Sequence, residues 1–318
     1  GKFTYLGLAA ALAAWYNLKY IKTNRRVLPM EIIQNFMQVY MYELEKYLQT
    51  KEEALKQISF QSDEANTDRQ LKEFLKKTIE DSFSSIPQSS ELTSVEFEGK
   101  VGTDMDILKS IRINRVLLPE EITNHIFKVI QSSKDSVSTK PDLCFEILYN
   151  HQFYYETIEL KSTKQDAIPG SSIQQILPEQ WVIFIKHSND YVKIATGQYI
   201  HAINSKMVFP DRSPRPQVSF KEMTTWNHSN RILKYASLIY KKDDNEHTKY
   251  NLIQDWQKVL SERWIDMLFH NTTSQKNEPW FHNTMRKFIL SFLEQYESLS
   301  EQEKATFKTT IQHLIKDE

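Results

Sequence analysis

Asp142, Glu159 and Lys161 are two acids and an amine at a spacing that suits metal-dependent phosphodiester hydrolysis. Mg²⁺ prefers carboxylate and carbonyl oxygens, keeps several waters, and binds through as few as one or two acids together with a substrate phosphate. Asp142 and Glu159 would supply the acids, and the backbone carbonyl of Leu160 would supply a third oxygen. Lys161 would orient the attacking water, help to deprotonate it, or neutralise the charge that develops on the phosphate.

A β-hairpin would bring these side chains together. Residues 143–149 and 152–161 have the pattern of two strands joined by a two-residue turn at Asn150-His151, which places Asp142 opposite Glu159. Residues two apart share a strand face, so Glu159 and Lys161 point the same way. The less specific interpretation is that these residues form the solvent side of an ordinary half-exposed strand.

The chain after Lys161 predicts the rest of a sheet. About twenty residues precede the apolar run 181–186, which is enough for a helical crossover to a parallel strand. A polar turn at 187–190 then leads into a further strand at 191–196, with Gly197 as its expected end. The order is therefore strand, strand, helix, strand, strand.

Pro141-Asp142, the segment 158–164 and the segment 168–176 resemble the PD-(D/E)xK endonucleases, most closely type II restriction enzymes. The resemblance covers at most residues 100–226. It implies an α/β fold with a mixed sheet flanked by helices, and Mg²⁺-dependent cleavage of double-stranded DNA to 5′-phosphate and 3′-hydroxyl ends. It also implies the roles given above for Asp142, Glu159 and Lys161, and a homodimer, whose twofold symmetry matches a palindromic site. The family often uses a further acid from an upstream helix, and the eligible acids are Glu96, Glu98, Asp104 and Asp106.

Several residues around this motif are candidates for DNA contact. Serine hydroxyls and helix N-terminal amides bind phosphates, glutamine reads adenine, and arginines in a stiff proline-rich loop suit phosphate or guanine. The candidates are Lys164, Gln165, Ser171, Ser172, Gln174, Gln175, Arg212 and Arg215. The alternative is a capped helix with solvated glutamines, followed by an ordinary surface loop.

Composition is that of a globular protein, with 318 residues, 40% hydrophobic and 25% charged. The net charge of −1 gives no overall sign of nucleic-acid binding, although residues 161–221 contain eight basic and four acidic side chains. The single cysteine, Cys144, argues against disulfides and favours the cytoplasm. The apolar stretch 3–16 is too short to span a membrane, and we expect a buried helix there and no membrane association.

Helical patterns flank the strand-rich middle of the chain. We expect a helical N-terminal region at 1–90 with helices at 31–49 and 71–83, a catalytic core at 91–226 and a helical bundle at 227–318, which together could form one compact domain.

Three other functions fit the same sequence. One is a DNA repair or recombination nuclease on the same core, and another is a non-catalytic helical module that binds DNA or protein. The third is a nucleotidyltransferase whose paired acids would be Asp104 and Asp106. This last class places a glycine-serine turn upstream, which the chain lacks.

Overall fold

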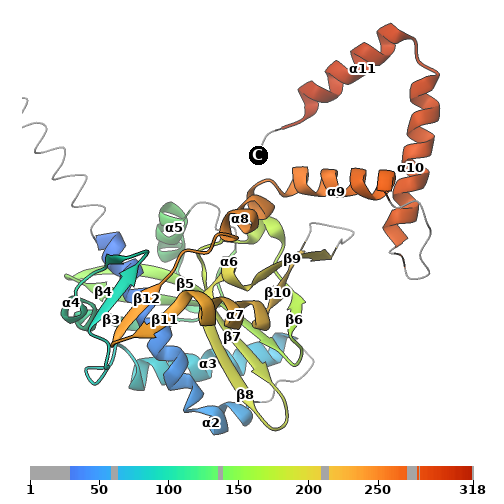
Figure 1. Cartoon of the computed structure of the whole chain (residues 1–318). Helices are drawn as coiled ribbons and strands as arrows, with labels where there is room; N and C mark the ends of the chain where they lie inside the picture. Colours follow the sequence, from blue (N-terminus) through green and yellow to red (C-terminus); the bar gives the residue numbers. More distant parts are fainter. Residues whose placement is uncertain are drawn as a thin grey trace, which may run out of the picture. The chain divides into compact units, whose positions relative to one another are not determined.

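The chain is a mixed α/β protein. The computed structural model describes residues 29–58, 64–134, 139–208, 215–270, 278 and 280–316, with the backbone alone at 64–68 and 205–208. The structure divides into two compact units, one that ends at Ile253 and one that begins at Gln254. All of the described strands belong to the first unit (Figure 1).

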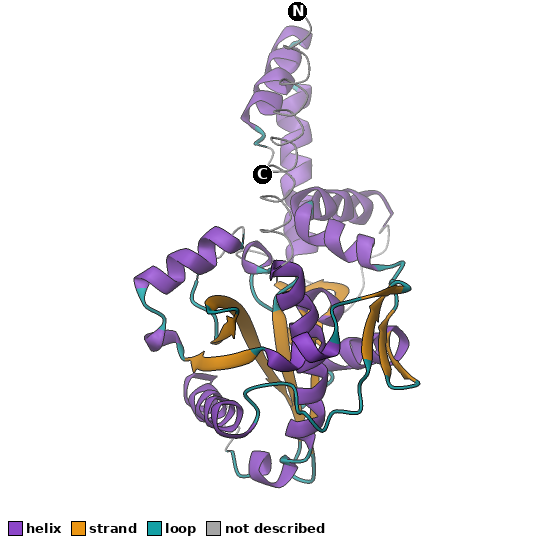
Figure 2. Ribbon diagram, turned by 90° about the vertical axis from the view of Figure 1, so that its left-hand side faces the viewer, coloured by secondary structure: helices purple, strands orange, loops and turns teal. Residues whose placement is uncertain are grey.

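A five-stranded mixed sheet forms the centre of the first unit. Its strands, in spatial order, are β3 (Arg112–Leu117), β4 (Leu143–Tyr149), β5 (Gln152–Thr163), β7 (Trp181–His187) and β8 (Val192–Gln198). β5 and β7 are parallel, and the other neighbouring pairs are antiparallel. Figure 2 shows the strands of the first unit with helices packed around them. The expected α/β class with a mixed sheet is confirmed.

The β4–β5 hairpin has the register that the sequence predicts. Tyr149 pairs with Gln152 and Leu143 with Ile158, so the next position along places Asp142 opposite Glu159. The turn residues Asn150 and His151 have φ values of 47° and 60°. Positive φ at both central residues defines a type I′ turn, whose twist matches that of the two strands. The local turn therefore fixes which side chains oppose each other.

The connection from β5 to β7 differs from the expected helix. It contains the short strand β6 (Ala167–Pro169) and a single 3-10 turn, η2 (Ile173–Gln175). Pro169 and Pro178 bracket only eight residues, and a helix of that length gains too few hydrogen bonds to offset its nucleation cost. The parallel pairing of β5 with β7, and the following hairpin to β8, are as predicted.

Alternate residues of β4 belong to two different hydrophobic clusters. Phe145 and Ile147 belong to the main core, which the helix at residues 29–49 and α3 (Glu64–Ser82) share. Cys144 belongs to a smaller cluster with Ile126 and Ile130 of α5 (Asn124–Ser133). Because side chains alternate across a strand, the first cluster covers one face of the sheet and the second covers the other.

Phe145 lies at the centre of the main core. Its side chain is fully buried and meets the ring of Tyr40 edge to face, with centroids 5.9 Å apart. Phe145→Ala should lower the free energy of unfolding by about 3–5 kcal/mol, because it removes a large buried side chain and leaves a cavity. Phe153→Ala, at a half-exposed position of β5, is the control and should cost much less. Urea denaturation measures both, and equal losses would contradict the assignment of the core.

Two smaller sheets complete the first unit. The first is β11 (Arg231–Lys234), β12 (Ser237–Tyr240), β1 (Ser94–Phe97) and β2 (Lys100–Val101), and the second is β6, β10 (Arg215–Ser219) and β9 (Ile203–Val208). The remaining short helices are α2 (Glu52–Lys56), α4 (Met105–Ser110), α6 (Tyr199–Ala202), α7 (Phe220–Asn230) and the 3-10 turn η1 (Pro119–Glu121). β12 pairs with β1, so residues on both sides of position 226 belong to one sheet, and the first unit continues to Ile253. The structure also places no boundary near residue 90, because the helices at 29–49 and α3 share the core of the sheet.

Helix side chains bind the outer edges of the five-stranded sheet. On β3, Val116 donates its N–H to Glu80 at 2.8 Å and accepts from the Lys76 ammonium at 2.6 Å. On β8, Gln49 accepts from the N–H of Ile194 and donates to the carbonyl of Val192, while Glu52 and Glu45 accept from the N–H groups of Val192 and Thr196. Main-chain groups on both edges therefore have partners within the same chain.

His201 of α6 is buried against Trp226, with the two rings stacked at 3.4 Å, and its Nε2 lies 3.2 Å from Glu246. Burial lowers the pKa of His201, although Glu246 opposes the shift. The unfolded chain therefore takes up this proton at a higher pH than the folded protein does. The contribution of neutral His201 to the free energy of unfolding is fully present above the ordinary pKa of about 6.5. It is lost as the pH falls through the lower pKa of the folded protein.

His201→Phe keeps an aromatic ring on Trp226 and removes the titrating group. Its free energy of unfolding should fall less than that of the unmodified protein between pH 7 and pH 5. Urea denaturation at the two pH values measures the difference. Identical pH dependence in both proteins would show that His201 does not contribute.

The C-terminal helices are α8 (Glu246–Gln254), α9 (Trp256–His270), α10 (Trp280–Glu297) and α11 (Glu301–Leu314). Apolar residues at helical spacing run from Ile253 to Leu268, and the structure divides them between α8 and α9 at Asp255. Ring contacts such as Phe292–Phe307 join α10 and α11, but neither helix has a fully buried residue. These two helices thus lack the buried core that the expected bundle requires. Among the described residues, no helix has the length and apolar character needed to cross a membrane.

Candidate active site

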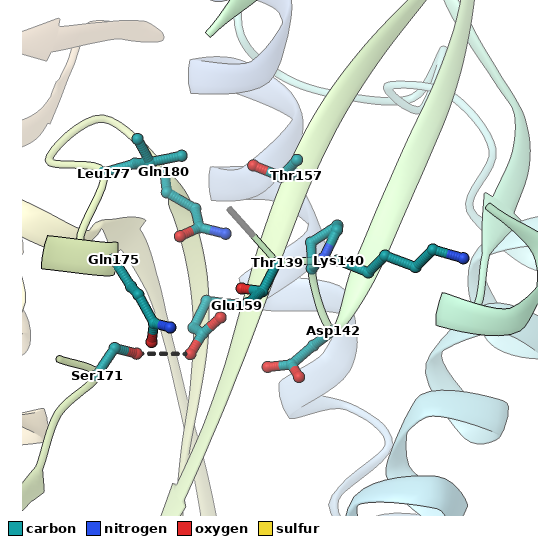
Figure 3. A pocket seen from close by; sticks show the side chains of 10 residues that line it. Thr139, Lys140, Asp142, Thr157, Glu159, Ser171, Gln175, Leu177 and Gln180 are labelled. Atoms are coloured by element: carbon teal, nitrogen blue, oxygen red, sulfur yellow. Dashed lines mark hydrogen bonds between the residues drawn. The ribbon is translucent and has the colours of Figure 1, made fainter. Parts of the chain in front are cut away.

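Asp142 and Glu159 line one pocket of about 210 Å³ (Figure 3). Asp142 comes just before β4, and Glu159 lies within β5 on the same face as Thr157. The connection between β5 and β7 supplies the opposite wall through Ser171 and Gln175. The hairpin register and this connection together bring the two acids to one hollow of the surface.

Asp142 is oriented by two partners on its two oxygens. Its Oδ2 accepts a hydrogen bond from the N–H of Leu160 at 2.8 Å, and its Oδ1 lies 3.4 Å from the ammonium of Lys72. Lys72 belongs to α3 and its side chain is only 12% exposed. A charge-assisted hydrogen bond and a half-buried ion pair therefore restrict the carboxylate to one position.

Glu159 is paired with Lys161 in a largely buried ion pair, with Nζ and Oε1 2.6 Å apart. Ser171 also donates its hydroxyl to the same Oε1 at 3.3 Å. Burial raises the pKa of Glu159, Lys161 lowers it, and the nearby charge of Asp142 raises it again, with a net increase. The two acids are thus close enough to interact electrostatically.

Lys161 is held in its charged form. Burial lowers its pKa, but the charge of Glu159 and the hydrogen bond to it raise the pKa, and the net shift is upward. An ammonium of raised pKa is a poor base at neutral pH. Of the three roles that the sequence suggests for Lys161, neutralising charge on a phosphate and orienting a water fit this state better than deprotonating the water.

Tyr199 positions the segment that carries Ser171, and sequence reasoning missed it. Its hydroxyl accepts a hydrogen bond from the N–H of Ser171 at 3.0 Å, and burial raises its pKa. Gly170 sits so close that an added Cβ would lie 2.7 Å from this hydroxyl. Nothing in the sequence connects Tyr199 with Ser171, because their contact depends on how β5, β7 and β8 pack.

The donor set of the pocket suits a hard divalent cation. Asp142 and Glu159 supply carboxylate oxygens. The N–H of Leu160 donates to Asp142, and the N–H and C=O of one strand residue point to the same side of the strand. The Leu160 carbonyl therefore faces the edge at which Asp142 lies. The described residues contain no group of three or more acids, histidines or cysteines placed to bind a metal. A Mg²⁺ ion here would therefore bind through two carboxylates, a main-chain oxygen and water.

The predicted DNA contacts lie in different places. Ser171 and Gln175 line the pocket, whereas Lys164, Gln165 and Gln174 are exposed outside it. Ser172 precedes η2, but its side chain does not cap that turn. Arg215 is exposed at the start of β10, and Arg212 lies outside the described residues. The structure thus brings two of the eight candidates to the acids.

The upstream acids considered from the sequence do not line the pocket. Asp104 caps α4 by accepting from the N–H of Asp106 at 2.8 Å, and Glu96 accepts from Ser237 at 3.2 Å. Glu98 lies in the turn between β1 and β2, with a φ of 50°. The upstream helix α3 instead contributes a positively charged residue, Lys72. The spacing of Lys72 from the motif gives no sequence signal for this contact.

Comparison of the chain with protein-family models, curated proteins and solved structures gives no match.

Proposed function

We propose that this protein is a Mg²⁺-dependent endodeoxyribonuclease that hydrolyses phosphodiesters of double-stranded DNA to 5′-phosphate and 3′-hydroxyl ends. The observation that carries the proposal is the placement of Asp142 and Glu159 on one pocket, with the Lys161 ammonium 2.6 Å from Glu159. The β4–β5 hairpin, together with the parallel pairing of β5 and β7, is also compatible with the restriction-endonuclease-like core that the motif implies. Site-specific cleavage by a homodimer, as in type II restriction enzymes, is the form of this activity that we favour.

The side chains of the pocket have distinct tasks in this reaction. Asp142 and Glu159 would bind Mg²⁺, which when bound would polarise the phosphate and lower the pKa of a water. Leu160 and Ser171 fix the two carboxylates through hydrogen bonds. Lys161 would stabilise the negative charge that develops on the phosphate, because its ammonium is preorganised in a largely buried position.

Digestion of plasmid DNA by the purified protein tests the proposal. We expect cleavage with Mg²⁺ and none with EDTA. Defined ends on sequencing would support a site-specific enzyme, whereas random ends would favour a repair or recombination nuclease. Absence of cleavage with Mg²⁺ or Mn²⁺ on plasmids of varied sequence would refute the nuclease function and leave a DNA- or protein-binding module.

A further inference from the structure

Apart from the two acids and Lys140, whose ammonium donates to the carbonyl of Ile122, the residues that line the pocket are uncharged. Thr157 is 1% exposed, lines the pocket, and its hydroxyl has no hydrogen-bond partner among the described residues. Gln180 also lines the pocket and is 9% exposed. Figure 3 shows Thr157, Gln175 and Gln180 around one space that Glu159 borders. A buried hydroxyl without a partner loses the hydrogen bonds that it makes in water, so an occupant that bonds to it would be favoured.

The chemistry of this region suits a flat heterocycle with donors and acceptors on its edge. Each glutamine amide offers both a donor and an acceptor, and in protein–DNA complexes Gln binds adenine through two simultaneous hydrogen bonds. Leu177, which also lines the pocket, adds an apolar surface. The whole pocket, including the part beside the acids, has a volume of about 210 Å³, the space of about seven waters at ~30 Å³ each, which is too small for a base pair.

We infer that the neutral region formed by Thr157, Gln175, Gln180 and Leu177 binds one unpaired nucleobase of the strand that is cut. The inference rests on the proposed function, because it assigns the acids to the phosphate and the neutral region to the adjoining base. A base inside a duplex has its Watson–Crick edge occupied and both faces stacked, so it must leave the duplex to enter such a pocket.

Nucleotide binding tests this inference separately from cleavage. The four deoxynucleoside 5′-monophosphates and 2-deoxyribose 5-phosphate are titrated into the full chain by calorimetry, with Ca²⁺ present. We expect at least one nucleotide to bind about tenfold more tightly than the sugar phosphate, since one good pair of hydrogen bonds contributes a factor of roughly 5 to 150. Equal affinities, or no nucleotide binding by a protein that cuts plasmid, would overturn the inference and leave the nuclease proposal intact.

Two substitutions locate the site. Thr157→Val keeps the shape of the side chain and removes its hydroxyl, and Gln180→Leu removes an amide of similar size. Each should reduce the preference for the nucleotide over the sugar phosphate about tenfold, with unchanged affinity for the sugar phosphate. Thr157→Val should not lower the melting temperature, because the hydroxyl makes no hydrogen bond within the part of the chain that the structure describes. Gln57→Leu, at an exposed position outside the pocket, is the matched control and should change neither quantity.

An unchanged preference in both pocket variants would place the base elsewhere. Nucleotide binding without any DNA cleavage would instead refute the nuclease proposal alone.

Discussion

Lys161→Ala should slow cleavage of DNA by about 10²- to 10³-fold while DNA binding stays close to normal. The side chain of Lys161 is 14% exposed, and its ammonium lies 2.6 Å from the carboxylate of Glu159. Its loss removes a preorganised positive charge and also allows the pKa of Glu159 to rise further. Single-turnover cleavage measures the rate, and DNA binding is measured with Ca²⁺, since metal-free carboxylates would repel phosphate.

Lys193→Ala provides the control for this substitution. Lys193 is an exposed lysine of β8 in the same sheet, and its ammonium lies over the ring of Tyr191. Its removal should leave the cleavage rate unchanged. Unaltered cleavage by Lys161→Ala would remove Lys161 from the reaction, and with it the main support for the nuclease.

Asp142→Asn should weaken binding of the divalent cation by about 10- to 100-fold or more and abolish most cleavage. The asparagine carbonyl can still accept the hydrogen bond from Leu160, so the local backbone is expected to persist. What is lost is a negative charge, which a cation needs and which also balances Lys72. Mg²⁺ titrations of the cleavage rate, and calorimetry with Ca²⁺, measure the effect.

Asp104→Asn is the matched control for Asp142→Asn. Asp104 caps α4, and asparagine caps helices as well as aspartate does, so this substitution removes an acid without harming the fold. Cation affinity should not change. A loss of cation binding in Asp104→Asn as large as that in Asp142→Asn would show that charge at a distance, and not coordination in the pocket, controls metal binding.

The arrangement of Asp142, Glu159 and Lys161 could be predicted because it depends on local rules. A two-residue turn at Asn150 and His151 sets the register of the hairpin, and the alternation of a strand sets which side chains share a face. The parallel partner of β5 was also predictable, since the length of the connection and the apolar run that follows it limit the topology.

Contacts that join distant parts of the chain could not be predicted. Lys72 reaches Asp142 across 70 positions, and Tyr199, the first residue of α6, reaches Ser171 across 28 positions. Two local features were also missed. The connection between β5 and β7 is long enough for a helix but forms only β6 and a 3-10 turn, and an apolar pattern at helical spacing continues across the break at Asp255. Periodicity shows which face of an element is apolar, and it gives little information on where the element stops.

The side chains of Gln49, Glu52 and Glu80 also limit how copies of this protein can associate. They bind the outward main-chain groups of Val116 on β3 and of Val192 and Ile194 on β8, so these positions are not open to intermolecular strand addition. A second molecule that extended the sheet would have to displace carboxylates and amides that already bind the backbone. Association of copies by extension of the five-stranded sheet is therefore disfavoured at these positions.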